Sequence, residues 1–175
     1  MYKQVLEFTT GAYGNDLPKR PTKMSRQEVE FLVGMILSET NELLQTVCED
    51  MDDCRETTLR CMNTDIKSEI MKFETDDDVC AEQADAMVDI MYYILNSASK
   101  KSIDLDRVFT EVHTANMNKR DPTTGKFILR ESDKKVIKPA GWKAPNIKKV
   151  LFDNDNDADG DSAFKWHNIP MNKLE

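Results

Sequence analysis

Ser38-Glu39-Thr40-Asn41-Glu42 and Glu82-Gln83-Ala84-Asp85-Ala86-Met87-Val88-Asp89 are the two stretches that decide the fold of this chain. Each places carboxylates three or four residues apart within an apolar run, and on a helix this spacing stacks them on one face. Like charges so placed weaken an isolated helix by roughly 0.2–0.5 kcal/mol per pair. We therefore expect two helices whose acidic faces need a positive partner.

The surroundings of the second stretch favour a buried acidic face. At about 100° per residue, Glu82, Asp85 and Asp89 share one narrow sector, and apolar residues occupy most of the rest. Such a helix is usually buried, and a buried carboxylate needs a partner. Ligand sets made only of oxygen suit Mg²⁺ or Mn²⁺ rather than zinc. We predict that two antiparallel helices hold a magnesium cluster for phosphate chemistry. The alternative is an ordinary solvated acidic face.

Composition limits the class of protein. A chain of 175 residues with 39% hydrophobic residues, 7% aromatic residues and 10 Met suits helices rather than a sheet. The net charge of −8 argues against a nucleic acid polymer as partner unless metal ions mediate the contact. No apolar run approaches the roughly 20 residues of a membrane span, and the N-terminus lacks a signal peptide's apolar core. The four cysteines lack C-x-x-C spacing. We expect reduced thiols, a cytoplasmic location and no membrane partner.

Periodicity and capping signals divide the chain into elements. Ser25 and Glu28 form a capping box at the start of a helix that runs to about Cys48. Further helices are expected at residues 2–13, 59–73, 79–99 and 105–119, and residues 127–130 should pair with 136–138 as a hairpin. The predicted fold class is all-α: a bundle of four to five helices in one domain, residues 1–150, that includes a small C-terminal hairpin and loop extension. Residues 151–175 are expected to be a mobile acidic tail of low complexity.

A second group of candidate residues begins in the last turn of the fifth expected helix. Asn116 and Lys119 lie one turn apart and point the same way. Together they could grip a phosphate and a ribose or base edge, although a basic helix end that satisfies its own dipole is the plain alternative. Lys138 and Trp142, in the loop extension, could cover a nucleotide.

These motifs, taken in order, resemble the all-α nucleoside triphosphate pyrophosphohydrolase superfamily. The resemblance is carried by Glu39-x-x-Glu42, by the acidic Glu82/Asp85/Asp89 helix that continues into Ile90-Met91-Tyr92-Tyr93, and by Asn116-x-x-Lys119. The superfamily includes MazG-like enzymes, phosphoribosyl-ATP pyrophosphohydrolase and dimeric dUTPases.

The resemblance implies hydrolysis of the bond between the α and β phosphates of a nucleotide, in a helical bundle completed by a second subunit as a homodimer or a dimer of dimers. Glu39 and Glu42 would be the first metal-binding pair, and whichever of them is free of metal could act as the catalytic base. Asp89 matches the last acid of the second pair. Ala86 stands where the family has an acid, so either Asp85 reaches the same metal, or Glu82 and Asp85 form the pair. Asn116, Lys119, Lys138 and Trp142 would bind the substrate.

Three alternatives stay open. Within the enzyme class, the substrate could be phosphoribosyl-ATP. The scaffold could also bind metal and nucleotide without turnover, which Ala86 would favour. Finally, the chain could be a purely structural bundle with acidic surfaces.

Overall fold

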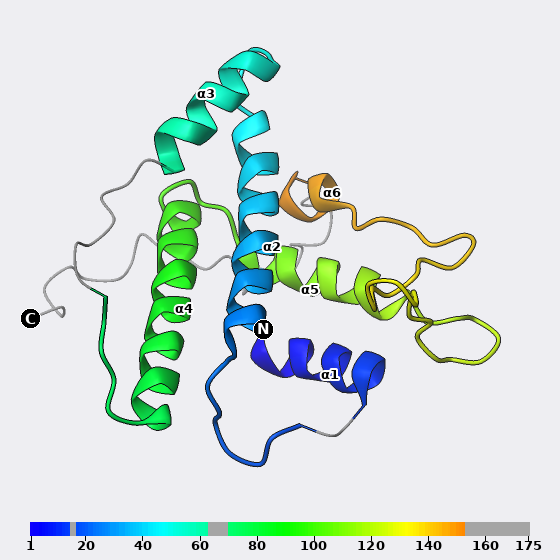
Figure 1. Cartoon of the computed structure of the whole chain (residues 1–175). Helices are drawn as coiled ribbons and strands as arrows, with labels where there is room; N and C mark the ends of the chain where they lie inside the picture. The colour runs from blue at the N-terminus through cyan, green and yellow to red at the C-terminus, as the bar shows by residue number, and fades with distance from the viewer. Residues whose placement is uncertain (15–16, 63–69, 153–175) are drawn as a thin grey trace, which may run out of the picture. The chain divides into compact units, whose positions relative to one another are not determined.

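The computed structural model describes residues 1–14, 17–62 and 70–152, and these contain six α-helices (Figure 1). The helices are α1 (Tyr2–Tyr13), α2 (Arg26–Gln45), α3 (Met51–Met62), α4 (Asp76–Ser99), α5 (Leu105–Met117) and α6 (Ile147–Phe152). The all-α prediction is confirmed. Most of the predicted tail, residues 153–175, lies outside the described residues.

The chain divides into two compact units. One unit combines Met1–Asp16 with Ile94–Glu175, and the other is Leu17–Tyr93. We call them the terminal unit and the central unit. The central unit contains α2, α3 and most of α4, whereas the terminal unit contains α1, the end of α4, α5 and α6.

Local capping signals explain where the long helices begin. At α2, Glu28 N donates to Ser25 Oγ at 3.3 Å while Ser25 N donates to Glu28 Oε2 at 2.7 Å, so the predicted capping box is present. At α4, Asp78 and Thr75 exchange the equivalent bonds. This cap starts α4 at Asp76, three residues before the predicted start.

The predicted helix over residues 59–73 is wrong in its position. Helix α3 begins at Met51 and ends at Met62, and residues 70–73 are not helical. Asp50 accounts for the early start, because its Oδ1 accepts hydrogen bonds from Asp52 N and Asp53 N, both at 2.9 Å. Residues 63–69 lie outside the described residues.

The two acidic helices run in the same direction, so the antiparallel prediction is also wrong. Lys23 Nζ lies 2.6 Å from Asp76 Oδ1, and Met24 N donates to Gln83 Oε1 at 2.7 Å. These contacts put the start of α2 beside the first turns of α4, as Figure 1 also shows within the central unit. The two helices are therefore parallel within the central unit.

Few residues are buried. In the described parts of the chain the buried hydrophobic residues are Cys54, Ala98 and Ala115. On α4, Val88 is 58% exposed and Tyr92 is 69% exposed. The prediction that this helix is buried therefore fails for a single copy of the chain, because no described element covers its apolar sides.

The terminal unit is held together by contacts of α5 with α1 and with the start of α6. His113 Nε2 lies 3.5 Å from Glu7 Oε2 of α1, and Asn146 N, just before α6, donates to Glu111 Oε1 at 3.0 Å. The predicted hairpin has one isolated bridge, Leu129 with Val136, rather than continuous strands, and a second bridge joins Arg120 to Phe127 just before it. Among the described residues, no helix combines the length and the apolar character that a membrane crossing requires.

Candidate functional site

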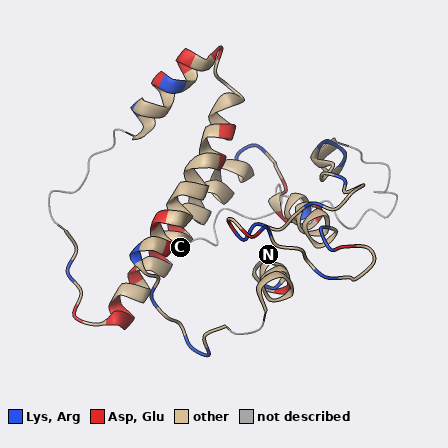
Figure 2. Cartoon of the chain, turned by 45° about the vertical axis from the view of Figure 1, so that its right-hand side comes forward, with Lys and Arg blue, Asp and Glu red and all other residues tan. Residues whose placement is uncertain are grey.

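The predicted metal ligands all belong to the central unit and all are exposed. Glu39 and Glu42 lie one turn apart on the last third of α2. Glu82, Asp85 and Asp89 follow one another along α4, whose acidic positions are red in Figure 2. None of these five carboxylates makes a side-chain hydrogen bond or ion pair with another described residue. The negative charges of these five side chains are therefore not offset by an ion pair with any described residue.

A single chain does not bring the acids of the two helices together. Gln83 lies beside Met24, and Asp89 lies about 9 Å further along α4, whereas Glu39 lies about 22 Å beyond Met24 at 1.5 Å per residue. The two acidic groups are thus displaced along the common helix direction. In agreement, the described residues contain no group of three or more His, Cys, Asp or Glu placed to hold a metal ion.

The donor set nevertheless fits a hard divalent cation. Its ligand atoms are all carboxylate oxygens, and Mg²⁺ in phosphate-processing sites usually takes only one or two carboxylates, with water and substrate phosphates completing the octahedron. A pair such as Glu39 and Glu42 is enough for that role.

The structure does bring the four predicted substrate-binding residues together, in the terminal unit. Lys119 Nζ donates to Asn116 Oδ1 at 2.7 Å, so these two side chains share a face as expected. Trp142 Nε1 donates to the carbonyl of Ala115 at 2.7 Å, which fixes the loop against the end of α5. The ammonium groups of Lys119 and Lys138 lie 5.6 and 4.5 Å from the Trp142 ring centroid.

The ammonium groups of Lys119 and Lys138 repel one another. Burial lowers the pKa of Lys119, and the neighbouring charge of Lys138 lowers it further. Both ammonium groups rest against one aromatic ring, and no carboxylate of the described residues pairs with either.

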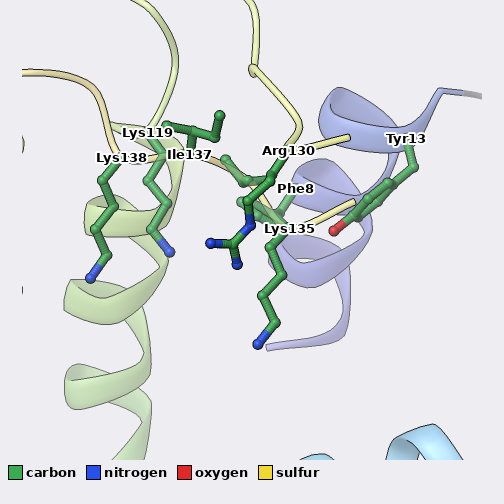
Figure 3. Close-up of a pocket in the computed structure, with 8 residues that line it drawn as sticks. Phe8, Tyr13, Lys119, Arg130, Lys135, Ile137 and Lys138 are labelled. Atoms are coloured by element: carbon green, nitrogen blue, oxygen red, sulfur yellow. The ribbon is translucent and has the colours of Figure 1, made fainter. Parts of the chain in front are cut away.

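A cavity of about 480 Å³ adjoins these lysines, and the sequence analysis missed several of its residues. Phe8 and Tyr13 of α1 form one side, and the hairpin contributes Arg130, Lys135, Val136 and Ile137 beside Lys119 and Lys138 (Figure 3). The available signal was the density of basic residues between Arg130 and Lys138 in a chain of net charge −8. The hairpin pattern predicted the pairing but not the direction of the side chains.

The turn of the hairpin is braced by an ion pair. Arg130 Nε and Nη2 donate to the two carboxylate oxygens of Asp133 at 2.8 and 2.6 Å. The hydrogen bond from Arg130 lowers the pKa of Asp133 to about 2, and the pKa of Arg130 is raised in turn. This bidentate pairing fixes the orientation of the Arg130 guanidinium plane beside the cavity.

Comparison with solved structures defines the class of protein. A crystal structure of a protein from Exiguobacterium sp. 255-15, proposed to be an NTP pyrophosphohydrolase, superposes with a TM-score of 0.74 at 25% sequence identity, covering 85% of this chain and 92% of that chain. The fold is that of the all-α pyrophosphohydrolases. No curated protein sequence matches the chain significantly.

The family follows from the sequence match. Residues 13–116 match the family described as phosphoribosyl-ATP pyrophosphohydrolase. This is more than half of the chain, and the chain belongs to that family. It is therefore a nucleotide pyrophosphohydrolase by class of enzyme, and the predicted resemblance is confirmed. The matched segment contains all five candidate metal ligands and Asn116.

Proposed function

We propose that this protein hydrolyses the bond between the α and β phosphates of a nucleoside triphosphate or a related nucleotide, in a Mg²⁺-dependent reaction. One observation carries the proposal: the family match spans both acidic helices, and the five candidate metal ligands on them are exposed and form no ion pair with a described residue. A nucleotide polyphosphate would be repelled by these acids unless cations bridge the two sets of oxygens.

The chain supplies carboxylates for two tasks. Glu39 and Glu42 would hold the cation, together with acids of α4. A bound divalent ion would acidify water and offset charge on the phosphates. Whichever of Glu39 and Glu42 stays free would accept the proton of the attacking water at a carboxylate oxygen. Water adds to the α phosphorus, the α–β bridging bond breaks, and pyrophosphate leaves.

We further propose that a second copy of the chain completes the acidic site. Helices α2 and α4 keep large apolar side chains exposed, and their acids are displaced from one another within one copy. A symmetric partner would cover the apolar positions and add a second set of acids to the first.

The test is a panel of NTPs, dNTPs and phosphoribosyl-ATP assayed for pyrophosphate in the presence and absence of Mg²⁺. We expect pyrophosphate and a monophosphate from at least one substrate, and loss of the reaction with EDTA. Release of orthophosphate alone would contradict the proposed bond. The family description favours including phosphoribosyl-ATP, and the panel decides between it and a common nucleotide.

Variants of α2 test the proposed roles of Glu39 and Glu42. Glu39→Gln and Glu42→Gln should each lower kcat by about 10²-fold or more, because either change removes a ligand or a general base. Glu30→Gln is the matched control, since Glu30 lies on the same helix and pairs only with exposed Arg26. Equal activity of all three variants would contradict the assignment. Metal binding without turnover in the wild type would instead favour an inactive scaffold, as Ala86 suggests.

A further inference from the structure

Two of the four free cysteines meet where the chain turns from α2 to α3. Cys48 follows the end of α2 and is half-buried, whereas Cys54 lies in the first turn of α3 and is 6% exposed. Their spacing is not C-x-x-C, so the sequence did not indicate a redox pair. We propose that these two thiols form a reversible intramolecular disulfide, with Cys48 reacting first with a low-molecular-weight disulfide. Neither cysteine belongs to the candidate functional site, so the inference does not rest on the proposed function.

The helical hairpin formed by α2 and α3 brings the two cysteines together. Thr58 Oγ1 donates to Asn41 Oδ1 at 3.2 Å, and this bond joins the two helices about two turns before Cys48 and about one turn after Cys54. The chain therefore reverses between these positions, and Figure 1 shows α3 turning back from the end of α2. Residues on the facing sides of such a hairpin approach one another in order toward its turn. This order places Cys48 opposite Cys54.

Polar contacts hold the backbone of the turn. Cys54 N donates to Asp50 O at 3.0 Å. Glu49 N, in the residue after Cys48, donates to Asp53 Oδ2 at 3.0 Å. The backbone beside each thiol is thus fixed before any reaction, which lowers the entropy lost when the two sulfur atoms are joined.

The surroundings of Cys48 keep the pair reduced under ordinary conditions. Burial, together with the adjacent thiol of Cys54, raises the pKa of Cys48 to about 11. The charge of Asp53 acts in the same direction, and the charge of Arg60 acts in the opposite one. Little thiolate of Cys48 is therefore present at neutral pH, and the thiolate is the reactive form. Disulfide formation should become faster as the pH rises toward 11.

The reaction consists of two successive exchanges. Cys48 loses its proton to solvent and its sulfur attacks the small disulfide, whose S–S bond breaks and releases one small thiol. Cys54 then loses its proton and attacks the Cys48 sulfur, and the second small thiol leaves. The two protein thiols lose two electrons and two protons in total, and the small disulfide gains both as it becomes two thiols. Exposure sets this order, because the small disulfide can reach half-buried Cys48 but not buried Cys54.

The test exposes the folded full chain to oxidised glutathione, blocks the remaining thiols by alkylation and cuts the chain with trypsin. Residues 27–55 contain both cysteines of the pair and end at the first Lys or Arg after Arg26, so they form one peptide, whereas Cys61 and Cys80 fall in other peptides. We expect this peptide to carry no alkyl group and to be about 2 Da lighter than its unblocked reduced form, the mass of two hydrogens. Dithiothreitol should restore both thiols.

Variants separate the roles of the two cysteines. In Cys54→Ala the second exchange is blocked, so one glutathione should remain on Cys48. In Cys48→Ser no exchange begins, so peptide 27–55 should gain no glutathione. Cys80→Ser is the matched control, because Cys80 is also half-buried but lies on α4, and it should leave disulfide formation unchanged. Circular dichroism checks the fold of each variant, and Cys48→Ser decides the matter if Cys54→Ala does not fold.

Three results would overturn the inference. The first is a peptide 27–55 that keeps two free thiols while exposed Cys61 reacts. The second is a disulfide from Cys48 to Cys61 or Cys80, and the third is glutathione that stays on Cys48 in the wild type.

The thermal midpoint shows whether the bond fits the folded hairpin. A disulfide that closes the loop between α2 and α3 restricts the unfolded chain, so the oxidised form should unfold at a temperature higher by roughly 5 °C. Circular dichroism of the oxidised and reduced forms measures this difference. A lower midpoint after oxidation would mean that the two thiols are not placed for a disulfide in the native state, and would overturn the assignment.

Discussion

Trp142 links the functional residues of the terminal unit to its fold. Its indole nitrogen donates to Ala115 O, and Ala115 is 6% exposed. The ammonium groups of Lys119 and Lys138 lie over its ring. One side chain therefore orders the loop and also sets the positions of Lys119 and Lys138.

Replacing Trp142 with Phe tests the structural part of this role. An aromatic ring is kept, although it is smaller than the indole, and the N–H donor is lost. The free energy of unfolding should therefore fall by at least about 1 kcal/mol, the net value of such a hydrogen bond. Urea unfolding followed by circular dichroism measures it. Tyr2→Phe is the control, because Tyr2 is 79% exposed and its hydroxyl makes no hydrogen bond with a described residue. A Trp142→Phe midpoint equal to wild type would show that the bond does not hold the loop.

The ion pair of the hairpin predicts a pH dependence. The pKa of Asp133 is about 2 in the folded chain, below the roughly 3.9 of an unfolded Asp. Its contribution to stability is therefore complete above about pH 4 and is lost as the pH falls toward 2. NMR titration of the carboxyl carbon should give a midpoint near 2. In Arg130→Gln the midpoint should return toward the ordinary value, and an unmoved midpoint would mean that Arg130 is not the cause.

At the scale of elements, short polar signals decide where helices begin. The capping box of α2 was legible in the sequence, because Ser25 and Glu28 have the required spacing. Asp50 caps α3 through its own carboxylate alone, which accepts hydrogen bonds from Asp52 N and Asp53 N, and the acids around it obscured this signal in the sequence. The prediction then relied on apolar spacing over residues 59–73 and placed the helix too late.

The contribution of the α2 cap to stability can be tested by replacing the capping side chain. Ser25→Ala should lower the free energy of unfolding by about 1 kcal/mol, since it exposes an unsatisfied N–H group at the first turn. Ser38→Ala is the matched control: it is the same substitution in the interior of the same helix, where Ala is the better helix former. Chemical denaturation compares the two. A loss as large for Ser38→Ala would contradict a capping role.

For the whole molecule, the exposed apolar positions of α2 and α4 predict self-association. Phe31 is 65% exposed, Leu43 69% and Tyr92 69%. Burying such area is worth roughly 25 cal/mol per Å², which favours a second copy as cover. We expect sedimentation velocity to show a dimer or larger species.

A charge on α4 should break this association. Tyr92→Glu places a carboxylate in the proposed interface and should shift the species toward monomer, with loss of Mg²⁺-dependent turnover if the acids of two copies act together. Ser132→Glu adds the same charge at an exposed turn of the hairpin and should leave the mass unchanged. A wild-type monomer at micromolar concentration would refute the proposal.

The amino-acid sequence by itself determined the helical class, the span of α1, the cap of α2, and the pairing of Asn116 with Lys119. These features depend on residues a few positions apart, where periodicity and capping geometry act. The family also followed from local motifs, and it is confirmed.

Only the tertiary structure decided the parallel course of α2 and α4, the separation of their acids, and the cationic cavity between α1 and the hairpin. Each of these joins residues distant in the chain: Lys23 with Asp76, or Phe8 with Lys135. The periodicity of one helix carries no information on the direction of its neighbour, and strand pairing alone does not say which side chains share a cavity. Both depend on the path of the connecting segments.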